Sequence, residues 1–438
     1  MNQTQKKALF LVFAVSAAAI FIYAVFHSIS SREYTQPGSS EQKNPVKIWA
    51  WDDKYNIIAA EEAVRAYQKR YPDTAFEIVS MTQEEIKARL KSAMITGSHK
   101  FLPDIVLIED YSIQYFLQNY ESEFLPLNSI VAQDDFVSCK TGVNHAGDTI
   151  YGVPFDCGTI GLFYRLDVIQ KAGFTEQDMR RLTWEDYIEV GKKVRETTGM
   201  AMLSINPTDL PLIRMMLQSA GAWYTDEEGK LYLEGNQVLA EAVRLYREIV
   251  NAGIALTAAD WNRFVHDFWE GNTASILTGS WISISILEEE SQKGLWRMAE
   301  VPRMKNCEAS VNASSIGGSC WYVLKYAGMA GEARHFLGET FASDTGLMDR
   351  LAEKIHLLSA LKSAQKSMAY QSGQPFYGSQ MIYQDLIYWT NRIPSVNYGT
   401  DTYKAEEIAA EAMQQVLAGR DIEEVLAEYQ REYGQLKF

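Results

Sequence analysis

The sequence predicts an α/β protein with several domain-sized units behind one N-terminal apolar segment. The chain has 438 residues, of which 47% are hydrophobic and 22% charged, so it can bury two or three substantial cores. Stretches typical of strands and of helices alternate along most of its length, as in proteins whose sheets are covered by helices. Beyond the N-terminal segment no run approaches about eighteen uncharged apolar residues, so a protein with several membrane-spanning helices is excluded.

The apolar segment covers residues 8–26 and follows Lys6 and Lys7. A helix of this length rises roughly 28 Å, which is close to the thickness of a bilayer's hydrocarbon core. The lysines predict that the short N-terminus stays in the cytoplasm while the rest of the chain crosses the membrane. Because a cleaved signal usually has a shorter apolar core, we expect an uncleaved signal-anchor. Ser28 and Ser30 nevertheless have the spacing that a signal peptidase needs, so cleavage stays open.

Residues 1–30 are thus expected to be a signal-anchor or a signal peptide, and the polar, turn-rich residues 31–45 a flexible tether. The body of the protein would then lie outside the cytoplasm. It would be attached to the outer face of the cytoplasmic membrane, or secreted if the segment is cleaved. No Cys lies near the end of the apolar segment, so the sequence offers no attachment residue for a lipid anchor.

The first part of the body alternates between strands and helices at short spacing. Apolar runs of β-branched and aromatic residues predict strands, and apolar residues three and four apart predict helices. The elements are, in order, a strand at 46–51, a helix at 57–71, a strand at 75–79, a helix at 84–95 and a strand at 104–108. This order is typical of a parallel sheet with both faces covered.

The alternation continues through the rest of the chain. A strand is predicted at 161–164, and the segment from Thr183 to Asp186 has the residue pattern of a capping box at a helix N-terminus. The remaining elements are helices at 209–220 and 237–252, strands at 274–277 and 320–324, and C-terminal helices that include 408–416 and 422–433.

Charge and motifs exclude several classes of function. The 56 Asp and Glu residues outnumber the 41 Lys and Arg residues, and a net charge of −15 argues against general nucleic-acid binding. The four cysteines form no C-x-x-C pair, and the six histidines are isolated, so neither a disulfide framework nor a metal site is indicated. There is no P-loop, no G-x-S-x-G and no H-E-x-x-H motif. We therefore expect no metal, no cofactor and no catalytic residues.

Acidic residues, and aromatic residues at the strand ends, are the candidate binding residues. In open α/β sheets, ligands bind beyond the carboxyl ends of the strands. An aromatic ring offers an apolar platform and a carboxylate accepts hydrogen bonds, which suits the apolar faces and hydroxyl rims of pyranose rings. Trp49 is expected in the core instead. The candidates are Trp51, Asp52, Asp53, Glu109, Asp110, Phe155, Asp156, Trp281 and Trp321.

Seven segments in this order resemble the carbohydrate-class solute-binding proteins of bacterial ABC importers, and are distantly similar to maltose-binding protein. The resemblance covers roughly residues 45–438. The segments are Lys47–Asp53, Pro103–Asp110, Tyr151–Asp156, Gly161–Val168, Thr183–Asp186, Gly271–Trp281 and Gly317–Leu324.

The resemblance implies a periplasmic-binding-protein-like fold, in which two α/β domains close a ligand into a hinged cleft between them. Domain I would comprise residues 45–140 and 300–343, and domain II residues 141–299 and 344–438. The implied ligand is a sugar or oligosaccharide, and the implied partners are the transmembrane permease subunits of an ABC transporter. We expect the body to be monomeric.

The resemblance also assigns roles to individual residues. Asp52 and Asp53 would approach sugar hydroxyls, and Trp281 would stack on a sugar ring. Glu109 and Asp110 match another contact loop.

Two further segments carry the remaining roles. Phe155 and Asp156 match a stretch that supplies an aromatic residue and an acid, while Phe376 and Tyr377 resemble a loop that lines the cleft. The chain departs from the family at Cys157 and Cys320, where small polar residues are usual, and in lacking the lipobox cysteine of Gram-positive members.

Two alternatives remain at this point. Acidic pairs such as Asp52 with Asp53 also occur in glycosidases, so the protein could be an extracytoplasmic carbohydrate-active enzyme. It could also use the same fold to bind a ligand other than a sugar, such as a polyamine, a metal complex or a peptide.

Overall fold

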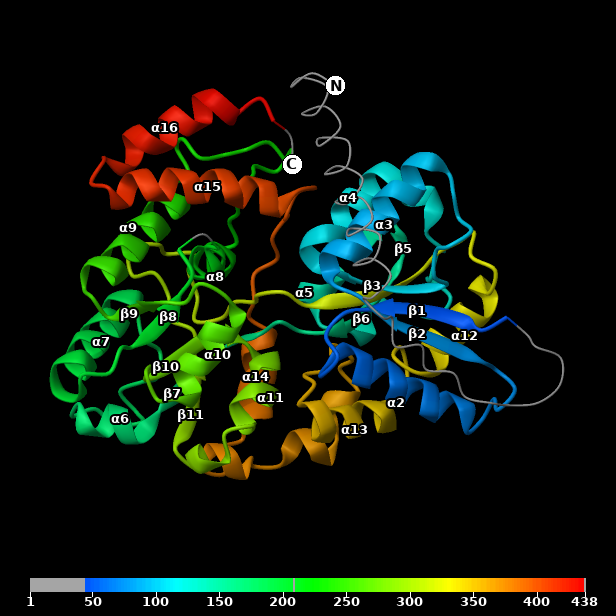
Figure 1. Ribbon diagram of the computed structural model, residues 1–438, viewed down its shortest axis with the longest axis horizontal. Helices are drawn as coiled ribbons and strands as arrows, with labels where there is room; N and C mark the ends of the chain where they lie inside the picture. The colour runs from blue at the N-terminus through cyan, green and yellow to red at the C-terminus, as the bar shows by residue number, and fades with distance from the viewer. Residues whose placement is uncertain (1–43, 208, 437–438) are drawn as a thin grey trace, which may run out of the picture.

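The structure is a computed structural model that describes residues 44–207 and 209–436 and has two lobes side by side (Figure 1). The predicted signal-anchor at residues 8–26 lies outside the described residues, as does nearly all of the predicted tether. Within the two described ranges, no helix is long and apolar enough to cross a membrane.

The strands are β1 Val46–Ala50, β2 Phe76–Ser80, β3 Ile105–Glu109, β4 His145–Ala146, β5 Thr149–Ile150, β6 Gly152–Asp156, β7 Ile160–Arg165, β8 Leu203–Ile205, β9 Ala255–Thr257, β10 Ser275–Gly279, β11 Trp296–Glu300 and β12 Ser319–Val323. The α-helices are α2 Asn56–Gln68, α3 Gln83–Thr96, α4 Asp110–Tyr120, α5 Ser138–Thr141, α6 Leu166–Lys171, α7 Trp184–Thr198, α8 Pro211–Ser219, α9 Gln237–Asn251, α10 Trp261–Trp269, α11 Ser283–Leu287, α12 Ala330–Glu339, α13 Thr345–Ile355, α14 Ile382–Thr390, α15 Thr402–Leu417 and α16 Ile422–Tyr433.

Lobe I is built on a five-stranded sheet in the order β2-β1-β3-β12-β6. β1 pairs in parallel with β2 and β3, as the early alternation predicted, whereas β12 is antiparallel to both of its neighbours. The sheet is therefore mixed and not purely parallel, because the chain returns from the other lobe to add β12 in the middle. α3 and α4 lie on one side of this sheet, and α2 and α13 on the other (Figure 1).

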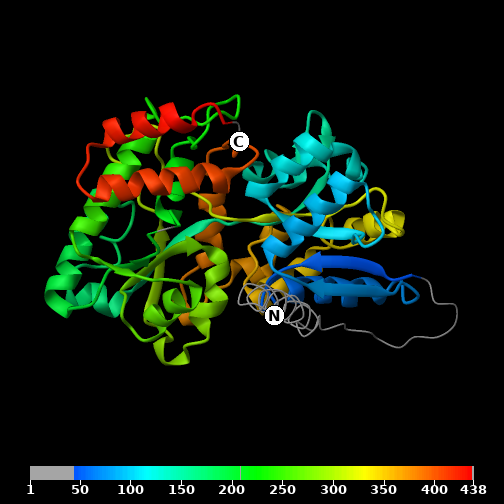
Figure 2. The same cartoon turned by 45° about the horizontal axis from the view of Figure 1, so that its top comes forward.

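Lobe II has a three-stranded antiparallel sheet in the order β10-β7-β11, and the short parallel pair β8 and β9 forms a separate small sheet in the same lobe. The C-terminal helices α15 and α16 pack against each other and against α9, so the last part of the chain covers one side of this lobe (Figure 2).

Three segments connect the lobes: residues 157–159 between β6 and β7, 301–318 between β11 and β12, and 356–381 between α13 and α14. β6 pairs in the sheet of lobe I, and α13 packs against α2. Residues 141–156 and 344–355 are thus placed with lobe I, although the expected boundaries assigned them to the second domain. The chain leaves lobe I only after it has added the edge strand of its sheet.

Local sequence explains where individual helices begin and end. At the start of α7 the Thr183 hydroxyl accepts a hydrogen bond from the backbone N–H of Asp186 at 3.2 Å, which completes the predicted capping box. Thr82 caps α3 in the same way. Gly97 and Gly199 end these helices with φ of 65° and 74°, a left-handed conformation that glycine adopts without strain. Every predicted strand and helix is present, with ends within about three residues of the expected ones.

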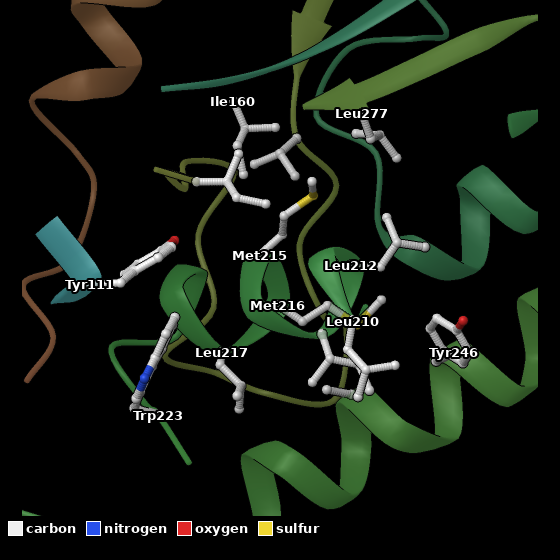
Figure 3. Close-up of a cluster of buried hydrophobic side chains, with 14 of the residues drawn as sticks. Tyr111, Ile160, Leu210, Leu212, Met215, Met216, Leu217, Trp223, Tyr246 and Leu277 are labelled. Atoms are coloured by element: carbon white, nitrogen blue, oxygen red, sulfur yellow. The ribbon is translucent and has the colours of Figure 1, made fainter. Parts of the chain in front are cut away.

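The core of lobe II forms around α8. Met215 and Met216 of this helix lie among buried side chains that include Tyr246 of α9 and Leu277 of β10 (Figure 3). Because all of these side chains are removed from water, their burial stabilises the lobe through the hydrophobic effect. Tyr111, which belongs to lobe I, approaches the same region beside Trp223, with ring centroids 5.6 Å apart.

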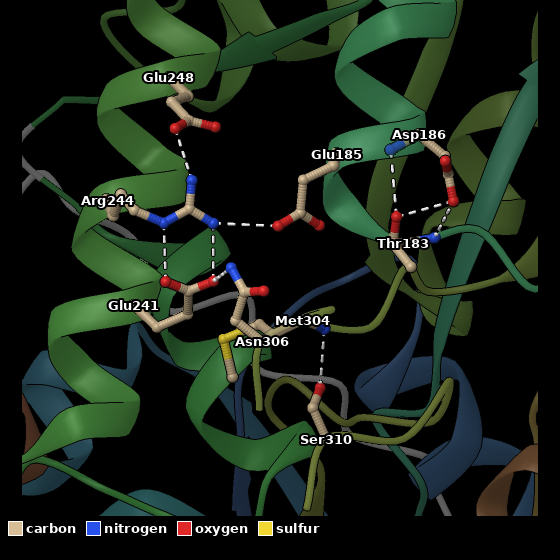
Figure 4. A network of polar contacts seen from close by, with 9 residues as sticks. All are labelled: Thr183, Glu185, Asp186, Glu241, Arg244, Glu248, Met304, Asn306 and Ser310. Atoms are coloured by element: carbon tan, nitrogen blue, oxygen red, sulfur yellow. Dashed lines mark hydrogen bonds and ion pairs between the residues drawn. The ribbon is translucent and has the colours of Figure 1, made fainter. Parts of the chain in front are cut away.

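A polar network joins α9 to α7 on the surface of lobe II (Figure 4). The guanidinium of Arg244 contacts Glu241 at 2.6 Å, Glu248 at 2.5 Å and Glu185 at 3.0 Å. Such partly exposed ion pairs each contribute little to stability, since water and salt screen them. The network fixes the relative orientation of the two helices more than it adds to the free energy of unfolding.

Candidate functional site

A cavity of about 700 Å³ opens between the lobes. Lobe I contributes the end of β3 and the start of α4, and lobe II contributes residues of β8, α8, α10, β10 and α15. The connecting segment before β12 closes one side through Ile316 and Gly317. The volume lies in the range typical of small-molecule binding sites, and the position matches the expected interdomain cleft.

One wall of the cavity is aromatic. Trp281 follows β10, and its ring lies 5.7 Å from that of Trp261 at the start of α10, which in turn stacks on Phe264 at 5.4 Å. The indole N–H of Trp281 donates a weak hydrogen bond to the carbonyl of Ile316 at 3.5 Å. Gly279 leaves room for this ring, because a Cβ there would lie 2.2 Å from the indole nitrogen. The Gly-Ser-Trp turn therefore fixes the orientation of the indole.

Another wall is charged. Arg214 of α8 is buried, and its guanidinium pairs with Asp209 at 2.7 Å and with Glu406 of α15 at 3.0 Å. Tyr224 donates its hydroxyl hydrogen to Glu406 at 3.0 Å. Burial raises the pKa of Glu406 to about 7, against the opposing effect of the Arg214 charge.

The two lobes meet across the cavity at Glu109. The hydroxyl of Tyr403, from α15 in lobe II, donates to the Glu109 carboxylate at 2.5 Å. Burial raises the pKa of Glu109, while this hydrogen bond and the charge of Arg214 lower it in part. Tyr111 follows two residues later, and its hydroxyl accepts from the backbone N–H of Gly317 at 3.3 Å. A carboxylate held in this way has further lone pairs that can accept hydrogen bonds from a ligand.

Two of the predicted site residues, Glu109 and Trp281, line this cavity. Trp51 instead lines a very small pocket behind Glu109, together with Ile108 and Lys87. Asp52 and Asp53 do not belong to the cavity lining.

Both of those acids are exposed on the loop after β1. Asp53 accepts a hydrogen bond from the Ser80 hydroxyl at 2.6 Å, and Asp52 has a positive φ of 64°. The prediction that they share one site with Trp281 therefore has no support in the geometry.

Asp110 and Asp156 are buried beside a connecting segment instead of facing the cavity. Asp110 forms an ion pair with Lys140, and burial raises the pKa of Asp110 to about 6 even though the Lys140 charge lowers it. Asp156 accepts hydrogen bonds from the backbone N–H and the hydroxyl of Ser319, at 2.8 and 2.7 Å. Cys320, also buried there, donates its S–H to Asp110. Both acids therefore contact other parts of the chain and, contrary to the expectation, do not line the cavity.

Four predicted aromatic contacts are core residues. Phe155 packs against Trp321 at 5.6 Å between ring centroids, and Trp321 stacks on Phe341 at 5.0 Å. Phe376 and Tyr377 are buried in the same hydrophobic cluster. None of the four lines the cavity. Phe155 and Trp321 were predicted from their positions near strand ends, and Phe376 and Tyr377 from the resemblance to a cleft-lining loop. All four side chains are instead buried in the core. Trp49 is buried, as expected.

Several cavity residues were absent from the prediction. Arg214 and Glu406 are single charged residues on otherwise apolar helix faces. Because a buried charge needs a partner, this pattern could have identified them as members of a buried ion pair. Tyr403 and Trp261 are partly exposed aromatic residues at helix N-termini and gave no such signal. Asp260 accepts from the backbone N–H of Arg263 at 2.8 Å and caps α10.

In the part of the chain that the structure describes, no group of three or more His, Cys, Asp or Glu residues could hold a metal ion. The four cysteines are free. Of the two that depart from the family pattern, Cys157 and Cys320, neither lines the cavity.

The fold and the cavity define a two-lobed protein that binds a small molecule between its lobes. The family model described as "Bacterial extracellular solute-binding protein" matches residues 62–375. The chain is also 35% identical over 381 residues to the lactose-binding protein of Rhizobium radiobacter, which covers 87% of this chain and 90% of that protein. The chain belongs to the bacterial extracellular solute-binding proteins. Because this family consists of binding proteins and not enzymes, the carbohydrate-active enzyme is no longer an alternative.

Solved structures show the same fold. The GacH receptor of Streptomyces glaucescens, solved unliganded and with acarbose, matches with a TM-score of 0.73 and 18% identity over 89% of this chain and 97% of that chain. The ABC transporter associated binding protein from B. animalis subsp. lactis Bl-04, solved with β-1,6-galactobiose, matches with a TM-score of 0.70 and 20% identity over the same shares. The predicted periplasmic-binding-protein-like fold is thereby confirmed for the described residues.

Proposed function

We propose that this protein is the extracytoplasmic sugar-binding component of an ABC importer. It captures a sugar or oligosaccharide in the cavity between its lobes and delivers it to the permease subunits. The observation that carries this proposal is the composition of the cavity, in which the aromatic wall of Trp281, Trp261 and Phe264 lies in the same space as several carboxylates. Saccharides need both surfaces, because their rings have apolar faces and hydroxyl edges.

The roles of the residues follow from their chemistry. Trp281 stacks on a sugar ring, since its indole is fixed between Gly279 and Ile316 and only partly buried. Glu109 accepts a hydroxyl hydrogen from the ligand in addition to that of Tyr403. Because Glu109 belongs to lobe I and Trp281 to lobe II, a ligand that contacts both favours the closed arrangement of the lobes.

Relatives suggest which saccharide to test first. The relative at 35% identity is a lactose-binding protein, and one of the structural matches was solved with β-1,6-galactobiose. Galactose-containing disaccharides are therefore the first candidates for this protein, with longer oligosaccharides next.

The proposal includes how the protein is attached. It is a monomer held at the outer face of the cytoplasmic membrane through residues 8–26, which have the length of a membrane span. Sequencing the N-terminus of the native protein tests this point. A mature chain that begins at Ser31 would show that the segment is a cleaved signal.

The test of the binding function is isothermal titration of the full-length protein against a panel of sugars. Chromatography of the same mixtures after incubation checks for turnover. We expect micromolar or tighter binding of at least one saccharide and no change in that saccharide. Binding of none of the sugars, or conversion of the one that binds, would contradict the proposed function.

A further inference from the structure

The charged side chains that line the cavity are almost all acidic. Among the described lining residues, Arg214 is the single basic side chain. Glu109 comes from lobe I and the other acids from lobe II, so the negative charge is distributed around the space. The six acids are Glu109, Asp209, Asp260, Glu406, Glu407 and Glu411.

Arg214 is not available to an anionic ligand. Its guanidinium is already paired with Asp209 at 2.7 Å and Glu406 at 3.0 Å, and it lies against the rings of Tyr111 and Tyr403 at 5.7 and 5.8 Å. Only 7% of its side chain is exposed. Turning toward a ligand would leave the buried Glu406 carboxylate without its partner, and an unpaired buried charge is strongly unfavourable.

Three of the six acids form no ion pair within the described residues: Glu109, Asp260 and Glu411. The charges of Arg214 and Lys87 act on Glu109 only from a distance and lower its pKa in part. Lys87 lines the small pocket behind Glu109 and not the cavity. A cleft between two lobes of low dielectric concentrates the field of such charges, so a ligand in the cavity experiences a negative potential.

We propose that the cavity selects saccharides by charge, accepting neutral sugars and amino sugars and excluding those with a carboxylate, sulfate or phosphate group. The inference rests on the proposed function and adds the chemical class of its ligand. Sugar hydroxyls and ammonium groups donate hydrogen bonds to the carboxylates, which in their ionised form can accept hydrogen bonds but not donate them. An anionic group would meet like charges and, among the described lining residues, no cation outside an ion pair. Like charges across an interface are unfavourable.

The test compares two ligands of equal size that differ in charge. Lactose is titrated into the full-length protein alongside derivatives in which the galactosyl C6 is a carboxylate or a carboxamide. If another sugar of the panel binds more tightly, its own pair of derivatives takes their place. We expect the carboxylate derivative to bind at least about tenfold more weakly than the carboxamide derivative. This difference in affinity should become smaller at high ionic strength, because salt screens the charges.

Variants identify the source of the discrimination. Asp260→Asn and Glu109→Gln should each reduce the ratio of the two dissociation constants. Glu196→Gln, an exposed position of α7 outside the cavity, should leave that ratio unchanged. Selection by charge would be overturned if the two derivatives bind with equal affinity. It would also be overturned if neither salt nor the cavity variants change the ratio of their dissociation constants. The sugar-binding function would stand in both cases. Failure of every sugar to bind would overturn the proposed function, and this inference with it.

Discussion

The cavity and a second polar region, the buried cluster of Asp110, Lys140, Asp156 and Ser319, contain the same kinds of residue and use them differently. In the buried cluster every acid has a partner: Lys140 for Asp110, and Ser319 for Asp156. In the cavity, Glu109 has the hydroxyl of Tyr403 but no ion pair among the described residues. Asp110 and Asp156 are buried, whereas Glu109 is only partly buried and faces the cavity. Burial, more than residue type or strand position, therefore separates a structural acid from one available to a ligand.

The buried cluster also lies on a segment that joins the lobes. Gly318 has a φ of 92°, and a Cβ at this position would lie 2.9 Å from the carboxylate of Asp110 and 3.0 Å from the ammonium of Lys140. The ion pair therefore packs directly against the connecting segment before β12. The cluster thus packs against one of the segments that connect the lobes, whereas the cavity lies open between the lobes.

Replacing Lys140 tests whether the buried cluster stabilises the fold, and it has the largest effect on the free energy of unfolding that we expect. Lys140→Met leaves the buried Asp110 without its cation, and we expect a loss of about 3–5 kcal/mol in the free energy of unfolding. Urea unfolding measures it, with Lys192→Met on the exposed face of α7 as the control. A change below about 1 kcal/mol would show that the pair is not structural.

Two tryptophans separate the cavity from the core. Trp281→Ala should weaken saccharide binding by roughly ten- to a few-hundredfold, because stacking area is lost, with little change in stability. Trp321→Ala should do the reverse and cost about 3–5 kcal/mol of stability, because Trp321 packs fully buried against Phe155 and Phe341.

Titration calorimetry and thermal unfolding of both tryptophan variants decide between these roles. Loss of stability in Trp281→Ala, with affinity unchanged in the folded fraction, would assign this residue to the core and remove it from the site.

The pH dependence of the free energy of unfolding tests the role of Glu406 in the charged wall of the cavity. The pKa of Glu406 is raised from 4.5 to about 7 by folding, so the folded protein binds this proton more tightly than the unfolded chain. The stability gained is full below pH 4.5 and is lost as the pH rises through about 7. Relative to Glu406→Gln, the wild type should therefore lose at most about 3 kcal/mol between pH 4.5 and 7.5. Urea unfolding at a series of pH values measures this difference, and a constant difference would contradict the assignment.

The smallest expected effect concerns the first connecting segment. A Cβ on Gly158 would lie 2.1 Å from the carbonyl oxygen of Ile316, where two connecting segments pair through the hydrogen bond from Ile316 N–H to Gly158 at 2.8 Å. Gly158→Ala should cost about 1–3 kcal/mol in the free energy of unfolding. Gly142→Ala, where a Cβ meets nothing within 4 Å, is the matched control and should be nearly neutral. Equal stability of the two variants would show that the segments separate easily.

The helices and strands could be predicted because their signals depend only on residues close together in the sequence. These signals are the spacing of apolar residues and the capping residues, such as Thr183 and Asp186. Sheet order could not, since β12 enters between β3 and β6 after a long excursion through lobe II. The predicted end of β3 correctly placed Glu109 at the cavity. It could not show that the neighbouring side chain, Asp110, turns inward to pair with Lys140. That difference depends on a residue thirty positions away in the chain.

The same limit applies to the aromatic residues. Phe155 and Trp321 were predicted to meet a ligand because they lie near strand ends, yet they meet each other across a strand pair that forms only in the folded lobe. Trp281 differs because its strand, β10, ends at the cavity.

We propose that a saccharide binds between the lobes, stacked on Trp281 and within hydrogen-bond distance of Glu109. A crystal structure of the protein with the tightest-binding sugar of the panel tests it most directly. We expect a sugar ring parallel to the Trp281 indole at van der Waals distance, with a hydroxyl donating to the Glu109 carboxylate. A sugar bound elsewhere, or in the cavity without contact to either residue, would contradict it.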